Sequence, residues 1–456
     1  MTALEVARIA GGAVAGEGGV VITGAEVDSR RVRPGDLFVA LPGERCDGHQ
    51  FVASALAVGA AALVRSTAEL APPPAGRALV RVADPLPAYW ELARHERERC
   101  GWTVAAVTGS VGKTTVKDFL AHLVGRQRPT GATTGNRNST LGLPAQLLSL
   151  PAATEVFVAE AGMSRPGELD LLGRILRPIG VLVYTRIAPV HTEFFADGLE
   201  GIARAKGELL PHLDPAGTLV INAADPRQAA YAEATAARVL RYGDGGDAWI
   251  ERLEDRGLLG TSFDLVVPGG RSRVELEVAG RHQAENLLAA ATAGTALGLT
   301  ANEIADAAQD LRAAPHRGRV YRLPGGAVLV DDSYNASPVA VARMLELLAA
   351  APGRRIAVLG EMYELGALTD EAHREVGVQA ARSCELLLAV GAAAARRLAE
   401  AARAAGLEAV ELVADADEAA RVLGAQLAAG DVVLVKGSRG VGLDRTVAAL
   451  LGEEAA

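Results

Sequence analysis

One stretch, Val104–Thr115, constrains the fold of this chain more than any other. It begins with an apolar run, Val104–Val107, that is typical of a buried strand, and the glycine-rich segment Thr108–Gly112 follows. From Lys113 onward, apolar residues recur at spacings of three and four, which predicts a helix. A strand, a glycine loop and a helix in this order favour a phosphate-binding loop, because the loop amides and the helix N-terminus attract an anion.

Two side chains of this loop have a specific expected contact with a nucleotide. Lys113 would reach the outer phosphates, and the Thr114 hydroxyl would bind Mg²⁺. The general motif has a glycine where this chain has Val107, and the alternative interpretation is a glycine turn beside a surface lysine. The position of Lys113 at a helix start favours the nucleotide site. The residues predicted to bind the nucleotide here are Gly109, Ser110, Val111, Gly112, Lys113, Thr114 and Thr115.

Length, charge and cysteine content limit the class of protein. A length of 456 residues suits about three domains, and a net charge of −9 argues against nucleic acid as the main ligand. The three cysteines, Cys46, Cys100 and Cys384, have no metal-binding spacing and suit a reducing cytoplasm. The first residues lack the order of a signal peptide, and no apolar run approaches the roughly 20 residues that span a bilayer. We therefore expect a cytoplasmic protein with no nucleic-acid partner and no stable membrane insertion.

The pattern of strands and helices predicts an α/β protein of three domains. Residues 1–100 form a small α+β N-terminal domain, and residues 101–314 form the central domain around the phosphate loop, with a mostly parallel sheet. Within it, the alternating segment 249–278 is expected to add an antiparallel patch to that sheet. Residues 315–456 alternate strands and helices, which predicts a Rossmann-like domain, although no Gly-x-Gly-x-x-Gly fingerprint follows its strands.

Three polar residues follow the predicted strands of the central domain. Glu160 ends an apolar strand, where phosphate-loop enzymes place a carboxylate that holds or orients Mg²⁺. His191 follows the next strand and is either a metal ligand or a turn residue. Lys206 lies in a predicted helix, and as a bare ammonium it cannot be a metal ligand, because Mg²⁺ would repel it.

Two loops are candidates for holding a sugar or a phosphate. The segment 133–144 is dense in hydroxyl and amide side chains, which suits hydrogen bonding to a sugar, although such clusters are also ordinary turns. Ser29 and Arg30 precede a predicted strand, and they either hold a diphosphate or form a charged surface turn.

Four further residues stand at helix or strand ends. His282 and Asn286 lie four residues apart, so they share one face of a helix and could meet an adenine or ribose edge. Lys436 and Arg439 occupy a glycine loop after the last strand, where they either grip a carboxylate or phosphate or remain solvated.

The order of these motifs resembles that of the ATP-dependent Mur ligases over all three predicted domains. The phosphate loop and the His/Asn helix are typical of the whole family, whereas the Gly-Asn-x-Asn loop and the Asp-Ser-Tyr-Asn of 332–335 are typical of its D-alanyl-D-alanine-adding branch. Val107 is normal in this family, but Ser139 and Ser337 stand where it usually has asparagine. The segments that carry the resemblance are Asp28–Arg30, Thr108–Thr115, Thr134–Asn138, Glu160–Met163, Ala205–Glu208, Gly280–Asn286, Asp331–Pro338 and Lys436–Arg439.

The resemblance implies a role for each matching residue. It places Lys113, Glu160, His191 and Lys206 in catalysis, and Thr114, Glu160, His191 and Lys206 at the metal. The lysine that matches Lys206 is often carbamylated in relatives, which turns an ammonium into an anionic oxygen ligand. The implied nucleotide contacts are His282, Asn286, Asp332, Asn335 and an arginine after the linker, Arg319 or alternatively Arg317. The implied substrate contacts are Ser29, Arg30, Thr133, Thr134, Asn136, Asn138, Tyr334, Lys436 and Arg439.

The resemblance also implies an activity. A monomeric enzyme would use ATP and Mg²⁺ to activate the terminal carboxylate of UDP-N-acetylmuramoyl-tripeptide as an acyl phosphate, and D-alanyl-D-alanine would capture it. The alternatives are a Mur-type ligase that adds diaminopimelate or lysine, a ligase like folylpolyglutamate synthase, and a phosphate-loop ATPase that hydrolyses without ligating. The Asp-Asn-Pro-Arg signature of the diaminopimelate branch does not occur in this sequence.

Overall fold

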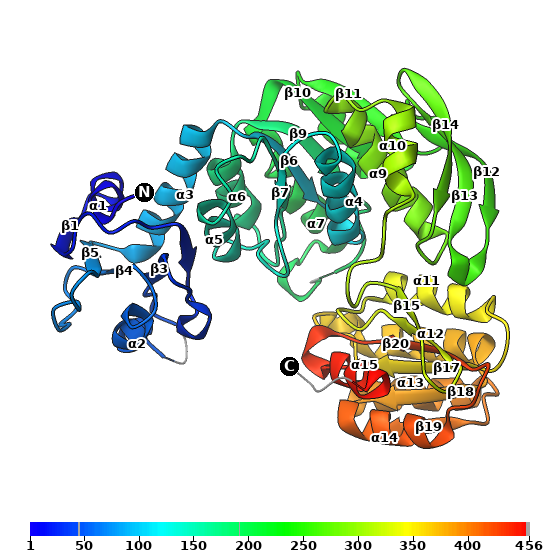
Figure 1. Cartoon of the computed structure of the whole chain (residues 1–456). Helices are drawn as coiled ribbons and strands as arrows, with labels where there is room; N and C mark the ends of the chain where they lie inside the picture. Colours follow the sequence, from blue (N-terminus) through cyan, green and yellow to red (C-terminus); the bar gives the residue numbers. More distant parts are fainter. Residues whose placement is uncertain (44–45, 191, 453–456) are drawn as a thin grey trace.

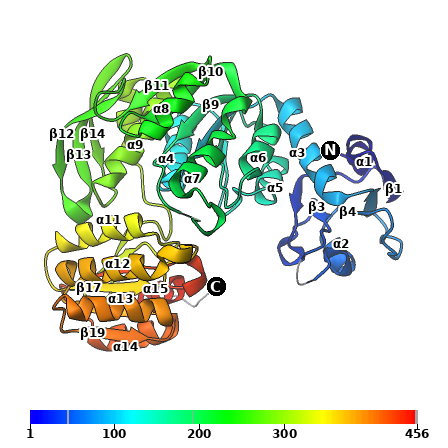
Figure 2. The same cartoon turned by 180° about the vertical axis from the view of Figure 1, so that it is seen from behind.

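The computed structural model describes residues 1–43, 46–190 and 192–452. Within these ranges the chain forms four sheets, distributed over three domains that follow one another along the chain (Figure 1). The N-terminal domain, in blue, and the C-terminal domain, in yellow to red, lie on different sides of the central domain, as the view from behind also shows (Figure 2). The predicted three-domain α/β architecture is confirmed.

The strand before the phosphate loop is an inner strand of the central sheet. The sheet order is β11-β10-β9-β6-β8-β7, and every neighbouring pair is parallel. Val104–Val107 are fully buried because helices cover both faces of a parallel sheet, which explains their continuous apolar run. The strands are β6 (Thr103–Thr108), β7 (Thr130–Ala132), β8 (Val156–Glu160), β9 (Ile179–Tyr184), β10 (Leu213–Asn222) and β11 (Arg238–Tyr242). The helices of this domain are α4 (Lys113–Gly125), α5 (Gly142–Leu148), α6 (Glu168–Leu176), α7 (Gly198–Gly207), α8 (Pro226–Glu233), α9 (His282–Ala296) and α10 (Ala301–Ala308).

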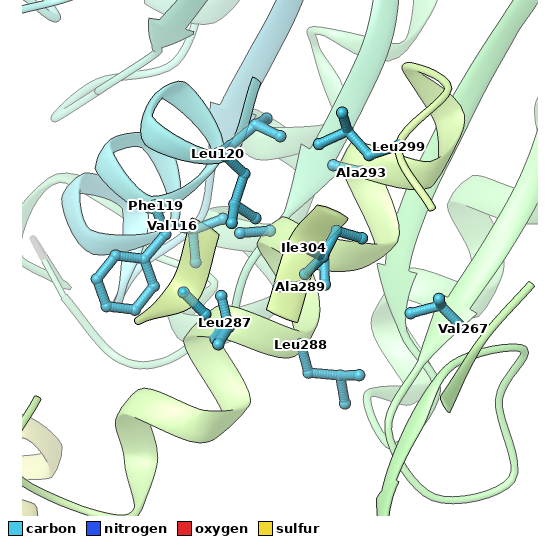
Figure 3. Close-up of a cluster of buried hydrophobic side chains, with 14 of the residues drawn as sticks. Val116, Phe119, Leu120, Val267, Leu287, Leu288, Ala289, Ala293, Leu299 and Ile304 are labelled. Atoms are coloured by element: carbon cyan, nitrogen blue, oxygen red, sulfur yellow. The ribbon is translucent and has the colours of Figure 1, made fainter. Parts of the chain in front are cut away.

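Two helices that carry site residues at their N-termini pack against each other in the core of the central domain. Figure 3 shows Phe119 and Leu120 of α4 next to the side chains of α9, such as Leu287. The many alanines of α9 present little bulk, so the backbones of the two helices can approach closely. This packing brings the phosphate loop and the His282 end of α9 together.

The segment 249–278 folds differently from the expectation. Strands β12 (Trp249–Asp255), β13 (Thr261–Val267) and β14 (Gly270–Leu276) form a separate sheet. The predicted antiparallel pairing is confirmed, but the prediction that this patch belongs to the parallel sheet is wrong. The reason is that alternate residues such as Phe263, Leu265 and Val274 join the core formed by α9 and α10. That packing gives the segment a buried face without any pairing to the parallel strands.

The N-terminal domain is joined to the central domain by a long helix. In α3 (Pro85–Cys100), Tyr89 Oη donates to Leu141 O at 3.1 Å, and Trp90 Nε1 donates to Thr140 O at 2.8 Å. One helix thus packs on both domains. The sheet of this domain has the order β1-β5-β4-β3-β2, in which only the pair of β1 and β5 is antiparallel. Its other elements are α1 (Ala3–Ala10), β1 (Ala13–Gly16), β2 (Gly24–Glu26), β3 (Asp36–Val39), α2 (Val52–Leu56), β4 (Ala61–Arg65) and β5 (Ala78–Val82).

The C-terminal domain has the predicted alternation of strands and helices. Its sheet has the order β15-β16-β20-β17-β18-β19, parallel except for the antiparallel edge pair of β15 and β16. No helix in the described part of the chain is both long and apolar enough to cross a membrane. The strands are β15 (Arg319–Arg322), β16 (Val328–Asp331), β17 (Arg355–Gly360), β18 (Leu386–Val390), β19 (Val410–Val413) and β20 (Val432–Lys436). The helices are α11 (Pro338–Ala349), α12 (Thr369–Ser383), α13 (Ala393–Ala404), α14 (Ala416–Gln426) and α15 (Asp444–Leu451).

Candidate active site

Two glycines give the phosphate loop its shape. Gly109 has φ +145° and Gly112 has φ +89°, and residues other than glycine rarely adopt such backbone angles. A Cβ atom on Gly109 would overlap the Thr185 hydroxyl, and one on Gly112 would lie 2.7 Å from Asn286 Oδ1. The loop therefore lies flush against β9 on one side and α9 on the other, which only glycine permits.

The two polar side chains at the start of α4 lie at the mouth of the loop. Lys113 Nζ donates to Ser110 O at 3.4 Å, and burial lowers the pKa of Lys113 while the nearby Glu160 carboxylate opposes that shift. Thr114 Oγ1 accepts a hydrogen bond of 3.3 Å from Arg317 Nη2. Arg317 belongs to the segment between the central and C-terminal domains, and its guanidinium lies 3.9 Å from the centre of the Tyr334 ring.

Glu160 ends β8 beside this loop and is only 3% exposed. Its Oε1 accepts a hydrogen bond of 2.7 Å from Asn138 Nδ2, and its backbone N–H donates to Thr133 Oγ1 at 2.9 Å. The main-chain carbonyl of Asn138 accepts from Gly162 N at 2.9 Å. This bond fixes the segment 133–144, here called the polar loop, onto the end of β8. A buried carboxylate held by a single amide is a suitable oxygen ligand for a divalent cation.

Lys206 of α7 lies behind the phosphate loop. Its side chain is almost fully buried, and Nζ donates to Gly109 O at 2.9 Å. Burial, together with the positive charge of Lys113, holds the pKa of Lys206 well below its ordinary value. Both causes favour the neutral form of the amine over the ammonium. His191, the other predicted partner of the metal, lies outside the described residues.

The loop after β16 connects the C-terminal domain to the site. Lys436, at the end of β20, is 3% exposed, and its Nζ lies 2.5 Å from Asp332 Oδ2 and 2.9 Å from Asn335 O. This buried ion pair fixes the loop that also carries Tyr334. Arg439 pairs with Asp444 at 2.8 Å, and its guanidinium lies 5.8 Å from the Tyr334 ring centre.

Most of the side chains described above line one cavity of about 510 Å³ between the central and C-terminal domains. At its edge, burial lowers the pKa of His282 to about 4, so its imidazole is neutral at neutral pH. The cavity combines a phosphate loop, the two cations Lys113 and Arg317, and hydrogen-bonding groups, which suits a nucleoside triphosphate. The predicted residues that line it are Ser110, Val111, Gly112, Lys113, Thr114, Thr115, Asn138, Glu160, His282, Asn286, Asp332, Tyr334, Asn335, Lys436 and Arg439.

The chain matches three family models in sequence order: "Mur ligase family, catalytic domain" over residues 21–97, "Mur ligase middle domain" over residues 107–294, and "Mur ligase, glutamate ligase domain" over residues 316–439. It is 34% identical to the UDP-N-acetylmuramoyl-tripeptide–D-alanyl-D-alanine ligase of Bacillus subtilis over 362 residues, which cover 78% of this chain and 77% of that protein. The chain belongs to the Mur ligase family.

Solved structures of Mur ligases have the same fold. A crystal structure of MurF from Acinetobacter baumannii matches with a TM-score of 0.87 and 30% identity, covering 99% of both chains. The MurF ligase from Thermotoga maritima in complex with ADP matches with a TM-score of 0.80 and 30% identity, covering 94% of this chain and 97% of the other.

Several predicted residues of this Mur ligase do not line the cavity. Arg319 lies on edge strand β15, 5.2 Å from the Tyr321 ring centre, whereas Arg317 reaches Thr114. Thr134 Oγ1 donates to Gln146 Oε1 of helix α5 at 2.9 Å. The predicted residues away from the cavity are Ser29, Arg30, Gly109, Thr133, Thr134, Asn136, Lys206 and Arg319, and their roles stay predictions.

Sequence reasoning missed other residues of the cavity. Gln283 follows His282 directly and accepts from Asn286 Nδ2 at 2.9 Å. It lies inside the motif 280–286, so its place beside His282 and Asn286 could have been predicted from the sequence. Arg343 of α11 lines the cavity and pairs with Glu285 of α9 at 3.2 Å, across the two domains. It follows no motif, and only the packing of α11 under the central domain places it there.

Proposed function

We propose that this Mur ligase joins D-alanyl-D-alanine to UDP-N-acetylmuramoyl-tripeptide, with ATP converted to ADP and phosphate. The relatives with this name, over most of their length, support the assignment. The observation that carries it is the single cavity in which the phosphate loop and Glu160 of the central domain meet Asp332 and Asn335 of the C-terminal domain. An enzyme that only hydrolysed ATP would not need the C-terminal domain beside the phosphate loop.

The first step is attack of the tripeptide carboxylate on the γ-phosphoryl group of ATP. Lys113 and Arg317 are the cations at the phosphate loop, and they neutralise charge that spreads over the transferring group. The step forms a carboxyl–phosphate bond and releases ADP. A carboxylate is a poor electrophile, and the phosphate supplies the leaving group that it lacks.

The second step is attack of the free amine of D-alanyl-D-alanine on the carbonyl carbon of the acyl phosphate. An amide bond forms, the bond from that carbon to the phosphate oxygen breaks, and inorganic phosphate leaves. Arg439, at the C-terminal edge of the cavity, is suited to the dipeptide carboxylate, whereas Lys436 is paired with Asp332 and supports the loop beside it. Bringing three substrates together in one geometry is the main source of rate acceleration.

The donor groups fit Mg²⁺. Glu160 provides a buried carboxylate and Thr114 a hydroxyl, and phosphate oxygens with water would complete the shell that this ion prefers. A bound Mg²⁺ supplies charge neutralisation and orients the phosphates. A carbamate on Lys206 would add an anionic oxygen, and burial favours the neutral amine, which is the form that can accept CO₂. We assign binding of the sugar-nucleotide end of UDP-N-acetylmuramoyl-tripeptide to Ser29, Arg30, Thr133, Thr134, Asn136 and Asn138. We assign binding of the adenosine end of ATP to His282 and Asn286.

The domain boundaries at 100/101 and 314/315, a monomeric state and a cytoplasmic location complete the proposal. The end of α3 at Cys100 supports the first boundary, and the segment between α10 and β15 supports the second.

The proposal is tested with an amine-acceptor panel. Phosphate release would be measured with ATP and UDP-N-acetylmuramoyl-tripeptide containing either diaminopimelate or lysine, in the presence of D-alanyl-D-alanine, diaminopimelate, lysine or glutamate. We expect release only with D-alanyl-D-alanine, together with a pentapeptide product by mass. Release with diaminopimelate, lysine or glutamate alone would identify another ligase of the superfamily, and release without any amine would identify a hydrolase.

A further inference from the structure

A buried ion pair joins the N-terminal domain to the polar loop of the central domain. Arg137 Nη2 donates to Glu26 Oε2 at 2.8 Å, although the two residues are 111 positions apart. The Glu26 side chain is 7% exposed and that of Arg137 is 22% exposed. Charges so far removed from water are costly unless they are paired, so each side chain fixes the place of the other.

The other carboxylate oxygen of Glu26 holds the turn that contains Ser29 and Arg30. Oε1 accepts from the backbone N–H groups of Val27 at 2.9 Å and Asp28 at 3.2 Å. Asp28 in turn caps the short helical turn by accepting from the Arg30 backbone at 3.1 Å. One carboxylate therefore positions both this turn and Arg137.

Arg137 and Asn138 are neighbours in the loop, but their side chains contact different domains. Arg137 contacts Glu26 of the N-terminal domain, and Asn138 donates to Glu160 at the end of β8. Only one peptide unit separates them, and the Asn138 carbonyl is fixed by Gly162. Arg137 is therefore adjacent in one loop to the amide that orients the Glu160 carboxylate.

We infer that Glu26 and Arg137 are positioning residues that couple the seating of the nucleotide-sugar end of the substrate to the orientation of Glu160. The inference rests on the proposed function, because it takes the turn at Ser29 and Arg30 to hold that end of the substrate. Neither residue contacts the reacting atoms. The phosphate loop and His282 lie outside this path of contacts, so we expect a loss of the ion pair to raise the KM for the UDP-tripeptide more than the KM for ATP.

The test is steady-state kinetics of Glu26→Gln, Arg137→Gln and the double variant, with each substrate varied in turn. We expect the KM for UDP-N-acetylmuramoyl-tripeptide to rise about tenfold in either single variant, with a fall in kcat, because a charge-assisted hydrogen bond is lost. The KM for ATP should stay within about twofold. The KM for the UDP-tripeptide in the double variant should not exceed that of the more impaired single variant, since both residues act through one contact. Arg137→Lys keeps the charge and should recover part of the loss.

Ser149→Ala is the matched control. Ser149 Oγ accepts from Ala25 N at 3.4 Å across the same interface, next to Glu26, but it has no bond to the polar loop. This variant should have wild-type kinetics. Variants of Glu26 and Arg137 that lose thermal stability but keep both KM values and kcat would overturn the inference, as would an equal rise in the KM for ATP. A wild-type protein that fails to ligate would instead overturn the proposed function, and this inference with it.

Discussion

Lys206 Nζ donates a hydrogen bond of 2.9 Å to the carbonyl oxygen of Gly109, so a buried amine of α7 supports the phosphate loop from behind. Burial and the charge of Lys113 hold the pKa of Lys206 far below its ordinary value. A neutral amine can add CO₂, whereas an ammonium has no free electron pair with which to do so. The lowered pKa thus favours the form of the side chain that a carbamate requires.

The first prediction concerns this lysine. Lys206→Ala should lower kcat by about 100-fold or more, because an anionic group that orients the metal is lost. Lys206→Arg keeps a hydrogen-bond donor at this position, and it should be equally inactive, since a guanidinium cannot form the carbamate. Native intact mass of the wild type should show added CO₂. Full phosphate release by Lys206→Ala would contradict the carbamate.

Lys113 provides the second prediction. Lys113→Ala should abolish the phosphate release that depends on both the UDP-tripeptide and D-alanyl-D-alanine, because no other side chain of the loop brings a cation to the outer phosphates. Arg126→Ala is the control, since Arg126 lies at the exposed far end of the same helix and pairs with Asp310. Wild-type turnover in Lys113→Ala would refute the role in ATP binding.

The third prediction separates two arginines that the sequence left open. Arg317 donates to Thr114, whereas Arg319 lies on edge strand β15 beside the Tyr321 ring. Arg317→Ala should therefore lower kcat/KM for ATP by about 100-fold, and Arg319→Ala should change it by less than about threefold. Both variants are measured by phosphate release with varied ATP. A larger effect at Arg319 would mean that the domains rearrange before catalysis.

A fourth prediction follows from the pKa of His282, which burial lowers from 6.5 to about 4. Between these two values the unfolded chain binds more protons at this site than the folded chain, so its contribution to stability is full above pH 6.5 and is lost as the pH falls towards 4. The loss is at most about 3.5 kcal/mol, at about 1.4 kcal/mol for each pKa unit. His282→Asn removes this term.

Thermal unfolding of wild type and His282→Asn at several pH values checks the sign. The stability difference between the two proteins should shift in favour of the variant as the pH is lowered from 7.5 to about 4.5. A difference that stays constant over this range would show that the folded and unfolded proteins bind the same number of protons at this site.

The fifth prediction concerns the contact between α4 and α9. Leu287 is fully buried in the core of the central domain (Figure 3), and Leu287→Ala should cost about 3 kcal/mol of unfolding free energy through lost burial and a cavity. Leu4 is 60% exposed, and Leu4→Ala should cost less than about 0.5 kcal/mol. Denaturant unfolding followed by circular dichroism measures both. Equal effects would mean that α9 is not held by this packing.

Much of the fold was readable because its signals are local. The apolar run before Gly109, the periodic apolar residues after Lys113 and the alternation of strands and helices in the last domain all depend on neighbours in the sequence. The segment 249–278 was misplaced because period-two alternation shows only that one face is buried. It does not show which other element covers that face, and here α9 and α10 do.

The chemistry of the site can be read from the order of the residues alone: a glycine loop with Lys113 and Thr114, and a carboxylate, Glu160, at a strand end. Each follows from covalent order, because a strand, a turn and a helix fix where the next side chain must lie. Three contacts could be found only in the folded molecule: Arg317 with Thr114, Asn138 with Glu160, and Arg137 with Glu26. These contacts join residues far apart in the chain, and the packing of separate domains, which no local pattern encodes, brings them within hydrogen-bond distance.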